Sequence, residues 1–306
     1  MTSLQDPSAF GEREADGEAA AVVAFWENLG LPGLVDVHTH FMPSNVLDKV
    51  WAYFDQVRTD AGGQAWPIAY RWPEDERVAL LRAFGVRRFS ALSYPHKPGM
   101  ASWLNQWAAG FAARTPDAVH SATFFAEPGA ASYVAEAIGA GARLFKAHLQ
   151  VGGYDPRDEL LAPVWALLAE ARVPVVVHCG SGPMPGRHTG PGPMSEVLAR
   201  HPRLLAIIAH LGMPEYGEFL DLAERFPGVY LDTTMAFTDF VERIAPFPAE
   251  LRPRLVAAAD RILLGSDFPN IPYSYLHQLH ALARLGLGPA WLRGVCHDNA
   301  ARLLGL

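Results

Sequence analysis

Cysteine is scarce in this sequence. Cys179 and Cys296 are the two cysteines among 306 residues, and their spacing matches neither a C-x-x-C motif nor a disulfide framework. A fold held together by disulfides is therefore not expected. We predict two inert, buried thiols in a protein of the reducing cytoplasm.

Long apolar stretches and basic clusters are also missing. No window approaches about 18 uninterrupted apolar residues, so no membrane-spanning helix is expected. The first twenty residues hold five acidic residues and lack the basic start and apolar stretch of a signal peptide. Because the net charge is −7, the isoelectric point is 5.9 and lysine and arginine form no run, we do not expect a nucleic-acid partner.

Hydrophobic residues, in contrast, make up half of the chain, which is enough to bury a large core. Eight short apolar or β-branched runs alternate with segments of helical period, as in βα units that build a parallel sheet. The predicted strands cover residues 34–38, 88–93, 120–125, 143–147, 174–178, 204–209, 229–232 and 261–264. This order predicts a (β/α)8 barrel, with a doubly wound open sheet as the alternative.

The barrel is expected to occupy one domain over residues 31–306. Residues 1–30 form an N-terminal arm that we expect to be partly disordered or to pack as a short helix near residues 19–28. In the helical segment 101–113, the four-residue spacing of Trp103 and Trp107 predicts one buried stripe. Prolines interrupt the segment after the seventh run, where we expect a broken helix or two short ones.

Histidines mark the ends of the predicted strands. His38 and His40 close the first run, and because side chains alternate along a strand, both project to the same face. His178 closes the fifth run, His210 follows the sixth and Asp267 follows the eighth. These candidates for one site therefore lie at the carboxyl ends of four strands, where (β/α)8 enzymes place their active sites. An open sheet leaves this convergence unexplained.

Three imidazoles and a carboxylate form a donor set suited to Zn²⁺, Mn²⁺ or a similar ion. Such an ion lowers the pKa of bound water from about 16 to about 7 and so supplies hydroxide at neutral pH. Asp267 can take the proton of that water and return it to a leaving group. His210 can hydrogen-bond the water or polarise the substrate.

The order of these motifs resembles a known family. The resemblance is to the amidohydrolase superfamily, and most of all to its amidohydrolase-related branch, which includes aminocarboxymuconate-semialdehyde decarboxylase. It is carried by D-V-H-T-H-F at 36–41, V-V-V-H-C-G at 175–180, A-H-L-G at 209–212, L-D-T-T at 231–234 and L-L-G-S-D-F-P at 263–269. The ending D-N-A-A-R-L-L-G-L at 298–306 is also typical of that branch.

The resemblance implies a (β/α)8 barrel with one divalent metal held by His38, His40, His178 and Asp267. Zinc is the expected ion, and manganese or another divalent ion is the alternative. His210 would be the catalytic histidine beside the water, and Asp267 would serve as the proton shuttle. The branch contains hydrolases of C–N and C–O bonds, lactonases and non-oxidative decarboxylases, so the motifs define the site and leave the substrate open.

Lys146 complicates the metal count, because it ends the fourth run with His148 two residues further on the same face. In some members of the superfamily a carboxylated lysine at this strand bridges two metals. Alternatively, Lys146 binds a substrate carboxylate or forms a structural ion pair. We take a single metal as the default and keep the binuclear site with modified Lys146 as an alternative.

Further candidates for substrate contacts lie in loops. The Gly- and Pro-rich stretch 180–193 follows His178 and lacks the G-K-[ST] of a phosphate-binding loop, so we expect it to cover the barrel mouth and to present Arg187 or His188. His96 follows the second run and is a further candidate pocket residue.

Taken together, the residues predict a metal-dependent hydrolase that uses activated water on an amide, lactone or related small molecule. The alternative within enzymes is a non-oxidative decarboxylase of an unsaturated or aromatic acid. A second alternative is a barrel that has lost catalysis and serves in binding. A homodimer would suit the family, although the sequence shows no interface.

Overall fold

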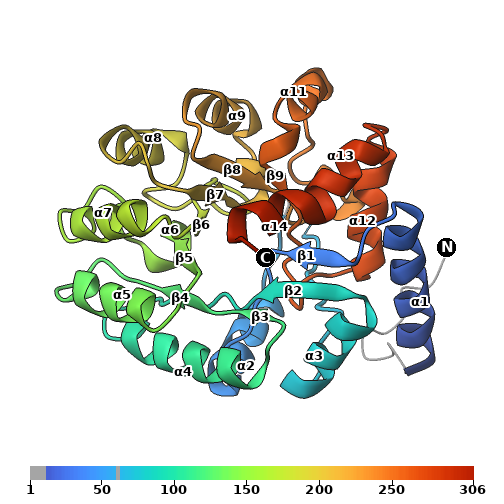
Figure 1. Ribbon diagram of the computed structural model, residues 1–306, viewed down its shortest axis with the longest axis horizontal. Helices are drawn as coiled ribbons and strands as arrows, with labels where there is room; N and C mark the ends of the chain where they lie inside the picture. The colour runs from blue at the N-terminus through green and yellow to red at the C-terminus, as the bar shows by residue number, and fades with distance from the viewer. Residues whose placement is uncertain (1–11, 60–62) are drawn as a thin grey trace.

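The computed structural model describes residues 12–59 and 63–306 of the chain and shows a ring of parallel strands surrounded by helices (Figure 1). The strands are β1 (Leu34–Asp36), β2 (Val86–Ser90), β3 (Ala118–Val119), β4 (Ser121–Thr123), β5 (Leu144–His148), β6 (Val175–His178), β7 (Ala206–Ile208), β8 (Val229–Asp232) and β9 (Ile262–Leu263). They pair in the orders β1-β2-β3 and β4-β5-β6-β7-β8-β9, and every pair is parallel.

The two sheets are parts of one ring. Only His120 separates β3 from β4, so these two strands together occupy the position of the predicted third strand. At the break, the Ser121 hydroxyl accepts a hydrogen bond from Ala91 N–H at 3.0 Å and donates one to Val119 C=O at 2.8 Å, so a side chain replaces part of the backbone ladder. On the other side, Val37 N–H donates to Leu264 C=O at 2.9 Å and links the end of β9 to the end of β1. The predicted (β/α)8 barrel is confirmed.

Helices surround this ring or lie across its ends. They are α1 (Glu12–Asn28), α2 (Ser44–Phe54), α3 (Glu74–Ala83), α4 (Ala101–Arg114), α5 (Ala130–Gly139), α6 (Leu149–Gly152), α7 (Ala162–Ala171), α8 (Pro191–Arg200), α9 (Tyr216–Arg225), α10 (Asp239–Glu242), α11 (Arg252–Ala257), α12 (Tyr275–Arg284), α13 (Pro289–Arg293) and α14 (Asn299–Leu304). The proline-interrupted segment after β8 contains two short helices, α10 and α11. None of the helices in the described ranges combines the length and apolar character needed to cross a bilayer.

The barrel interior is closed at one end. Val35, Leu144, Val176 and Ile207 are buried in one cluster to which α14 contributes Leu304. Figure 1 shows α14 lying across the centre of the ring of strands. Because this helix closes the amino-terminal ends of the strands, the opposite, carboxyl-terminal end is left for the site.

The N-terminal helix α1 is longer than the segment expected to be helical and packs on the barrel. The Trp26 indole N–H donates to Phe84 C=O at 3.0 Å, and Glu18 accepts hydrogen bonds from the Tyr70 hydroxyl and from Leu276 N–H. The expected disorder of the arm concerns residues 1–11, which lie outside the described ranges.

One packing prediction is wrong. Trp103 is 42% exposed, whereas Trp107 is half-buried and stacks on Phe111 at 5.3 Å between ring centroids. The helical period identified a shared face of α4 but not what covers it. Trp103, at the start of this face, borders the cavity described below and not the core.

Candidate metal centre and active site

The first two site histidines lie where the ends of β1 and β9 are joined by backbone hydrogen bonds. Asp267 N–H donates to His38 C=O at 2.8 Å, and His40 N–H donates to Phe268 C=O at 2.7 Å. These bonds bring the D-V-H-T-H and G-S-D-F-P motifs together although they lie more than 200 residues apart in the sequence. The main chain therefore holds the two motifs in contact.

Three ligand-type side chains converge at this point. One nitrogen each of His38 and His40 and a carboxylate oxygen of Asp267 all lie within 4.8 Å of one another, and all three residues are buried. His40 Nε2 is 2.9 Å from Asp267 Oδ1, and His38 Nε2 is 3.5 Å from the same oxygen. Two nitrogens and a carboxylate oxygen at this spacing fit a divalent ion that prefers nitrogen and oxygen donors.

The Nδ1 atom of each histidine faces a hydrogen-bond acceptor. His38 Nδ1 lies 2.8 Å from Asp232 Oδ2, and His40 Nδ1 lies 3.0 Å from Leu92 C=O. Both partners are acceptors, so Nδ1 is a donor in each ring. His38 Nε2 keeps its lone pair, which faces Lys146 Nζ at 3.0 Å. His40 Nε2 lies 2.9 Å from the Asp267 carboxylate and donates to it, so a bound metal would have to replace this proton. Carboxylate or carbonyl partners of this kind orient metal-ligating histidines.

Asp232 is the residue that links the two halves of the site. Its Oδ2 accepts from His38, and its Oδ1 accepts from the backbone N–H groups of His210 and Thr234 at 2.9 and 3.1 Å. His210 Nδ1 lies 3.1 Å from Thr234 C=O, which leaves Nε2 of His210 unprotonated as well. Asp232 lies in the L-D-T-T motif, for which the sequence predicted no role; its position directly at the end of β8 was the available signal.

His210 occupies an uncommon backbone conformation. It lies in the short turn Ala209–Gly212 with a φ of 56°, and Leu211 follows with 54°. Left-handed backbone at non-glycine residues is costly and is typical of functional sites. The His210 ring lies 5.3 Å from that of His38 between centroids, so the turn presents His210 to the ligand cluster.

His178 reaches the same cavity but is turned toward a loop. β5 and β6 place His148 directly opposite His178, and their rings stack at 4.1 Å with 10° between planes. His178 Nε2 donates to Gly182 C=O at 3.1 Å, while its ring centroid is 4.8 Å from that of His210. In the described part of the chain, the compact ligand cluster consists of His38, His40 and Asp267, with His178 adjacent to it.

Lys146 is the nearest cation to the cluster. Its side chain is fully buried, and Nζ lies 3.0 Å from His38 Nε2. Burial lowers the pKa of Lys146 to about 8, because removal from water disfavours the ammonium form. The structure thus places the predicted Lys146 at the floor of the site.

The pKa shifts of the site residues favour the protonation states that can bind a metal. Burial, reinforced by the Lys146 charge, lowers the pKa of His38 to about 3, so its imidazole is neutral at physiological pH. Burial likewise holds the pKa of His178 well below its usual range. For Asp267 burial acts in the opposite direction, but the hydrogen bond with His40 and the neighbouring imidazoles outweigh it and keep the carboxyl pKa low. Neutral imidazoles and an ionised carboxylate are the forms that bind metal.

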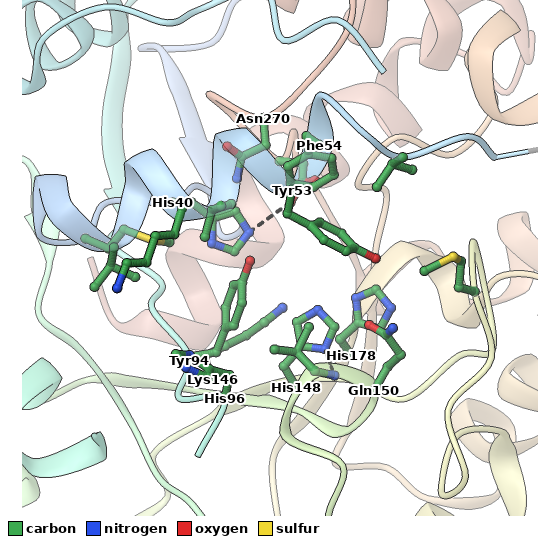
Figure 2. A pocket seen from close by; sticks show the side chains of 18 of the residues that line it. His40, Tyr53, Phe54, Tyr94, His96, Lys146, His148, Gln150, His178 and Asn270 are labelled. Carbon is green, nitrogen blue, oxygen red and sulfur yellow. Dashed lines mark hydrogen bonds and ion pairs between the residues drawn. The ribbon is translucent and has the colours of Figure 1, made fainter. Parts of the chain in front are cut away.

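A cavity of about 670 Å³ opens above this cluster. Figure 2 shows His40, Tyr94, Lys146, His148 and His178 pointing into it. The Tyr94 ring lies edge-on to His40 at 5.6 Å between centroids and 4.8 Å from His148, so it forms part of the inner wall. Tyr94 was not singled out in the sequence; it follows the second strand with no motif around it.

The predicted substrate-contacting residues in the loops differ in whether they line the cavity. His96 lines the cavity, as do Pro183 and Met184 of the loop 180–193, whereas Arg187 and His188 are not among the lining residues. Arg187 is exposed, and His188 Nδ1 lies 3.4 Å from Asp155 Oδ2. The loop therefore covers the mouth with apolar side chains.

Gly265 of the L-L-G-S-D-F-P motif is packed closely against His38 and Thr234. A Cβ at this position would lie 2.8 Å from His38 Cβ and closer still to Thr234 Oγ1. Overpacking of this kind costs about 1–3 kcal/mol, so we expect Gly265→Ala to lower the free energy of unfolding by that amount and to weaken metal binding. Gly217→Ala is the matched control, because its Cβ would meet only Leu251 Cδ1 at 3.8 Å. Urea unfolding measures both; equal stability of the two variants would contradict this packing.

Comparison with known proteins agrees with the geometry. The sequence profile of the Amidohydrolase family matches residues 35–306. The chain belongs to the amidohydrolase family. No curated protein sequence matches this amidohydrolase.

Solved structures similar to this amidohydrolase have low sequence identity. An uncharacterised TIM-barrel protein from Bordetella bronchiseptica is 20% identical, with a TM-score of 0.69 over 89% of this chain and 98% of its own. A 5-carboxyvanillate decarboxylase from Novosphingobium aromaticivorans, complexed with manganese, is 15% identical, with a TM-score of 0.60 over 90% and 96%. A probable 2-pyrone-4,6-dicarboxylic acid hydrolase from Acinetobacter baumannii is 12% identical, with a TM-score of 0.58 over 90% and 100%. At these identities the likeness establishes the fold alone.

Proposed function

We propose that this amidohydrolase is a metal-dependent hydrolase that cleaves an amide, lactone or related bond of a small organic molecule. The observation that carries the proposal is the buried cluster of His38, His40 and Asp267, with Nδ1 of both imidazoles held by an acceptor, at the floor of a large cavity. A structural site needs no cavity of this size, whereas a catalytic site does.

Each residue has a defined task in this proposal. A divalent ion held by His38, His40 and Asp267 would supply Lewis acidity and lower the pKa of water. Asp267 takes the proton from the attacking water and returns it to the leaving group. His210, with an unprotonated Nε2 facing the cluster, orients the water by accepting a hydrogen bond. His178 is the proposed fourth ligand, and for that its Nε2 must release the Gly182 carbonyl.

Zinc is the proposed ion, because two imidazoles and a carboxylate are a common catalytic zinc set. Manganese, the metal named for the N. aromaticivorans decarboxylase, is the alternative. A cytoplasmic location and a homodimer remain predictions from the sequence.

The experiment that tests the proposal combines metal analysis with product analysis. The protein is loaded with Zn²⁺ or Mn²⁺ and incubated with lactones, amides and unsaturated or aromatic acids in ¹⁸O-labelled water. We expect one ¹⁸O atom in the product of a hydrolysed substrate and no activity after chelation. Release of CO₂ without ¹⁸O incorporation would replace hydrolysis with the decarboxylase alternative, and full activity without metal would contradict the proposal.

Lys146 gives a pH-dependent prediction. A bound cation repels the Lys146 ammonium, so metal binding and protonation compete, and affinity should rise as pH increases toward the lysine pKa of about 8. At pH 7 this competition weakens binding about tenfold, so Lys146→Met should bind Zn²⁺ about tenfold more tightly at pH 7 and equally at pH 9. Calorimetric titration at both pH values measures this. Loss of metal in the variant would instead support a carboxylated, bridging Lys146.

A further inference from the structure

Lysine is rare in this chain, and every lysine lines the same cavity. The sequence holds three lysines against 22 arginines. Lys49, Lys97 and Lys146 all line the cavity above the barrel, whereas none of the arginines in the described ranges does. The lining residues make up less than a tenth of the chain, so scattered surface lysines would not produce this placement.

Lys49 and Lys97 carry charge that no ion pair among the described residues neutralises. Wherever the described residues form ion pairs, the cation is an arginine or a histidine. Asp267 is the single carboxylate among the described lining residues. In a protein of net charge −7, the cavity is therefore a local region of positive charge, which attracts anions.

The lysines lie at two depths. Lys146 is fully buried at the floor, 3.0 Å from His38 Nε2. Lys49 on α2 and Lys97 in the loop after β2 are both exposed, so they lie at the rim, where the cavity meets solvent. A ligand that reaches from His38 to the rim must pass through the middle of the cavity.

One side of the middle of the cavity is apolar. On α2, residues at three- and four-residue spacing face the cavity, among them Val46, Val50 and Phe54, with Lys49 on the same face. Trp103 of α4 also lines the cavity and is 42% exposed. Figure 2 shows Tyr53 and Phe54 on one side of the cavity and His148 and Gln150 on the other. The apolar side formed by α2 and Trp103 can bind a hydrophobic segment of a ligand, whereas His148 and Gln150 make the opposite side polar.

We propose that Lys49 and Lys97 form an anion-binding rim and that the substrate is an elongated amphiphile with a terminal carboxylate. Its reacting group lies against His38 and Asp267, its apolar body against α2 and Trp103, and its carboxylate against the two rim ammonium groups. A lysine ammonium is a compact charge on a flexible stem and can follow a mobile carboxylate without a fixed bidentate geometry. The position of the reacting end rests on the proposed metal-dependent function.

The test uses probes that place one end at the metal. Hydroxamates bind divalent metals, so a series of α,ω-dicarboxylic acid monohydroxamates of increasing chain length is compared with the corresponding methyl esters, which lack the terminal charge. Binding to the full-length, Zn²⁺-loaded protein is measured by calorimetry. At the best chain length we expect the carboxylate to bind about tenfold more tightly than the ester, as two exposed charge-assisted contacts would give.

Variants decide where this preference arises. The double variant Lys49→Met with Lys97→Met should bind carboxylate and ester equally, while its affinity for the ester stays within about twofold of the unsubstituted protein. Both residues are exposed, so the fold should be retained, and thermal unfolding checks this. Arg187→Met is the matched control: it removes an exposed cation of the mouth loop that does not line the cavity, and it should keep the preference.

Two results would overturn the rim site: no carboxylate preference at any chain length, or a preference that persists in the double variant. If the protein binds no metal, the proposed function fails separately. In that case, decanoate and methyl decanoate replace the hydroxamates on the metal-free protein. A decanoate preference that the double variant abolishes then supports the rim site, and any other result overturns it.

Discussion

Asp267→Asn is expected to lower kcat/KM for the hydrolysed substrate by about 10³-fold, within the range that general acid–base catalysis contributes. The substitution removes a proton acceptor and replaces a charged metal ligand with a neutral amide. It also places an amide NH₂ or a weaker acceptor beside His40 Nε2, which now lies 2.9 Å from Asp267 Oδ1. Steady-state kinetics in the presence of saturating metal measures the loss.

Asp260→Asn is the control for this prediction. Asp260 is exposed and lies 3.7 Å from Arg261, remote from the cavity lining, so its substitution should leave kcat/KM unchanged. Activity of Asp267→Asn within about threefold of the unsubstituted enzyme would remove Asp267 from the chemistry, because loss of a positioned acid or base costs far more.

Asp232→Asn is expected to weaken metal binding by about 10- to 100-fold, the usual effect of removing a carboxylate that orients a ligating histidine. Asp232 accepts from His38 Nδ1 through one oxygen and from two backbone N–H groups through the other. An amide can satisfy only one of these sides. If its oxygen serves the backbone, its NH₂ faces His38 Nδ1 and forces the proton to Nε2, which can then no longer bind metal.

Calorimetric Zn²⁺ titration tests this prediction, with Asp239→Asn as the control. Asp239 is exposed and pairs with Arg284 at 3.3 Å on the surface, so its substitution should not change the affinity. The same Zn²⁺ affinity in Asp232→Asn and in the unsubstituted protein would show that His38 keeps its tautomer without the carboxylate.

The strand pattern and the ends of the strands were predictable, because they are local properties of the sequence. Short apolar runs gave the order of the ring, and side-chain alternation placed His38 and His40 on one face. The interruption at His120 was not predictable, since it depends on a hydrogen bond between Ser121 and Ala91 of a neighbouring strand. Trp103 illustrates the same limit, because helical period defines a face but not its neighbours.

The orientation of His178 also depends on tertiary contacts. The His178 ring is oriented by its hydrogen bond to Gly182 C=O, in the loop that begins at Gly180. Gly182 N–H in turn donates to Met213 C=O at 2.9 Å. A Cβ at Gly180 would lie 2.7 Å from the backbone carbon of Gly212, so the loop and the turn that carries His210 are closely packed. A strand-end histidine is visible in a sequence, whereas the carbonyl that its Nε2 meets is not.

The rim lysines show a third kind of limit. Lys49 lies in a helix and Lys97 in a loop, and neither belongs to a sequence motif. Only the fold shows that both line the same cavity as Lys146. Lysines that are distant in the sequence can form an anion-binding site only when the fold brings them together.

Anomalous diffraction from crystals of the Zn²⁺-loaded protein, recorded at the zinc edge, tests the central claim most directly. We expect one peak per chain between His38 Nε2, His40 Nε2 and the Asp267 carboxylate. A peak elsewhere in the chain, or none at this point in protein that holds stoichiometric zinc, would contradict the account.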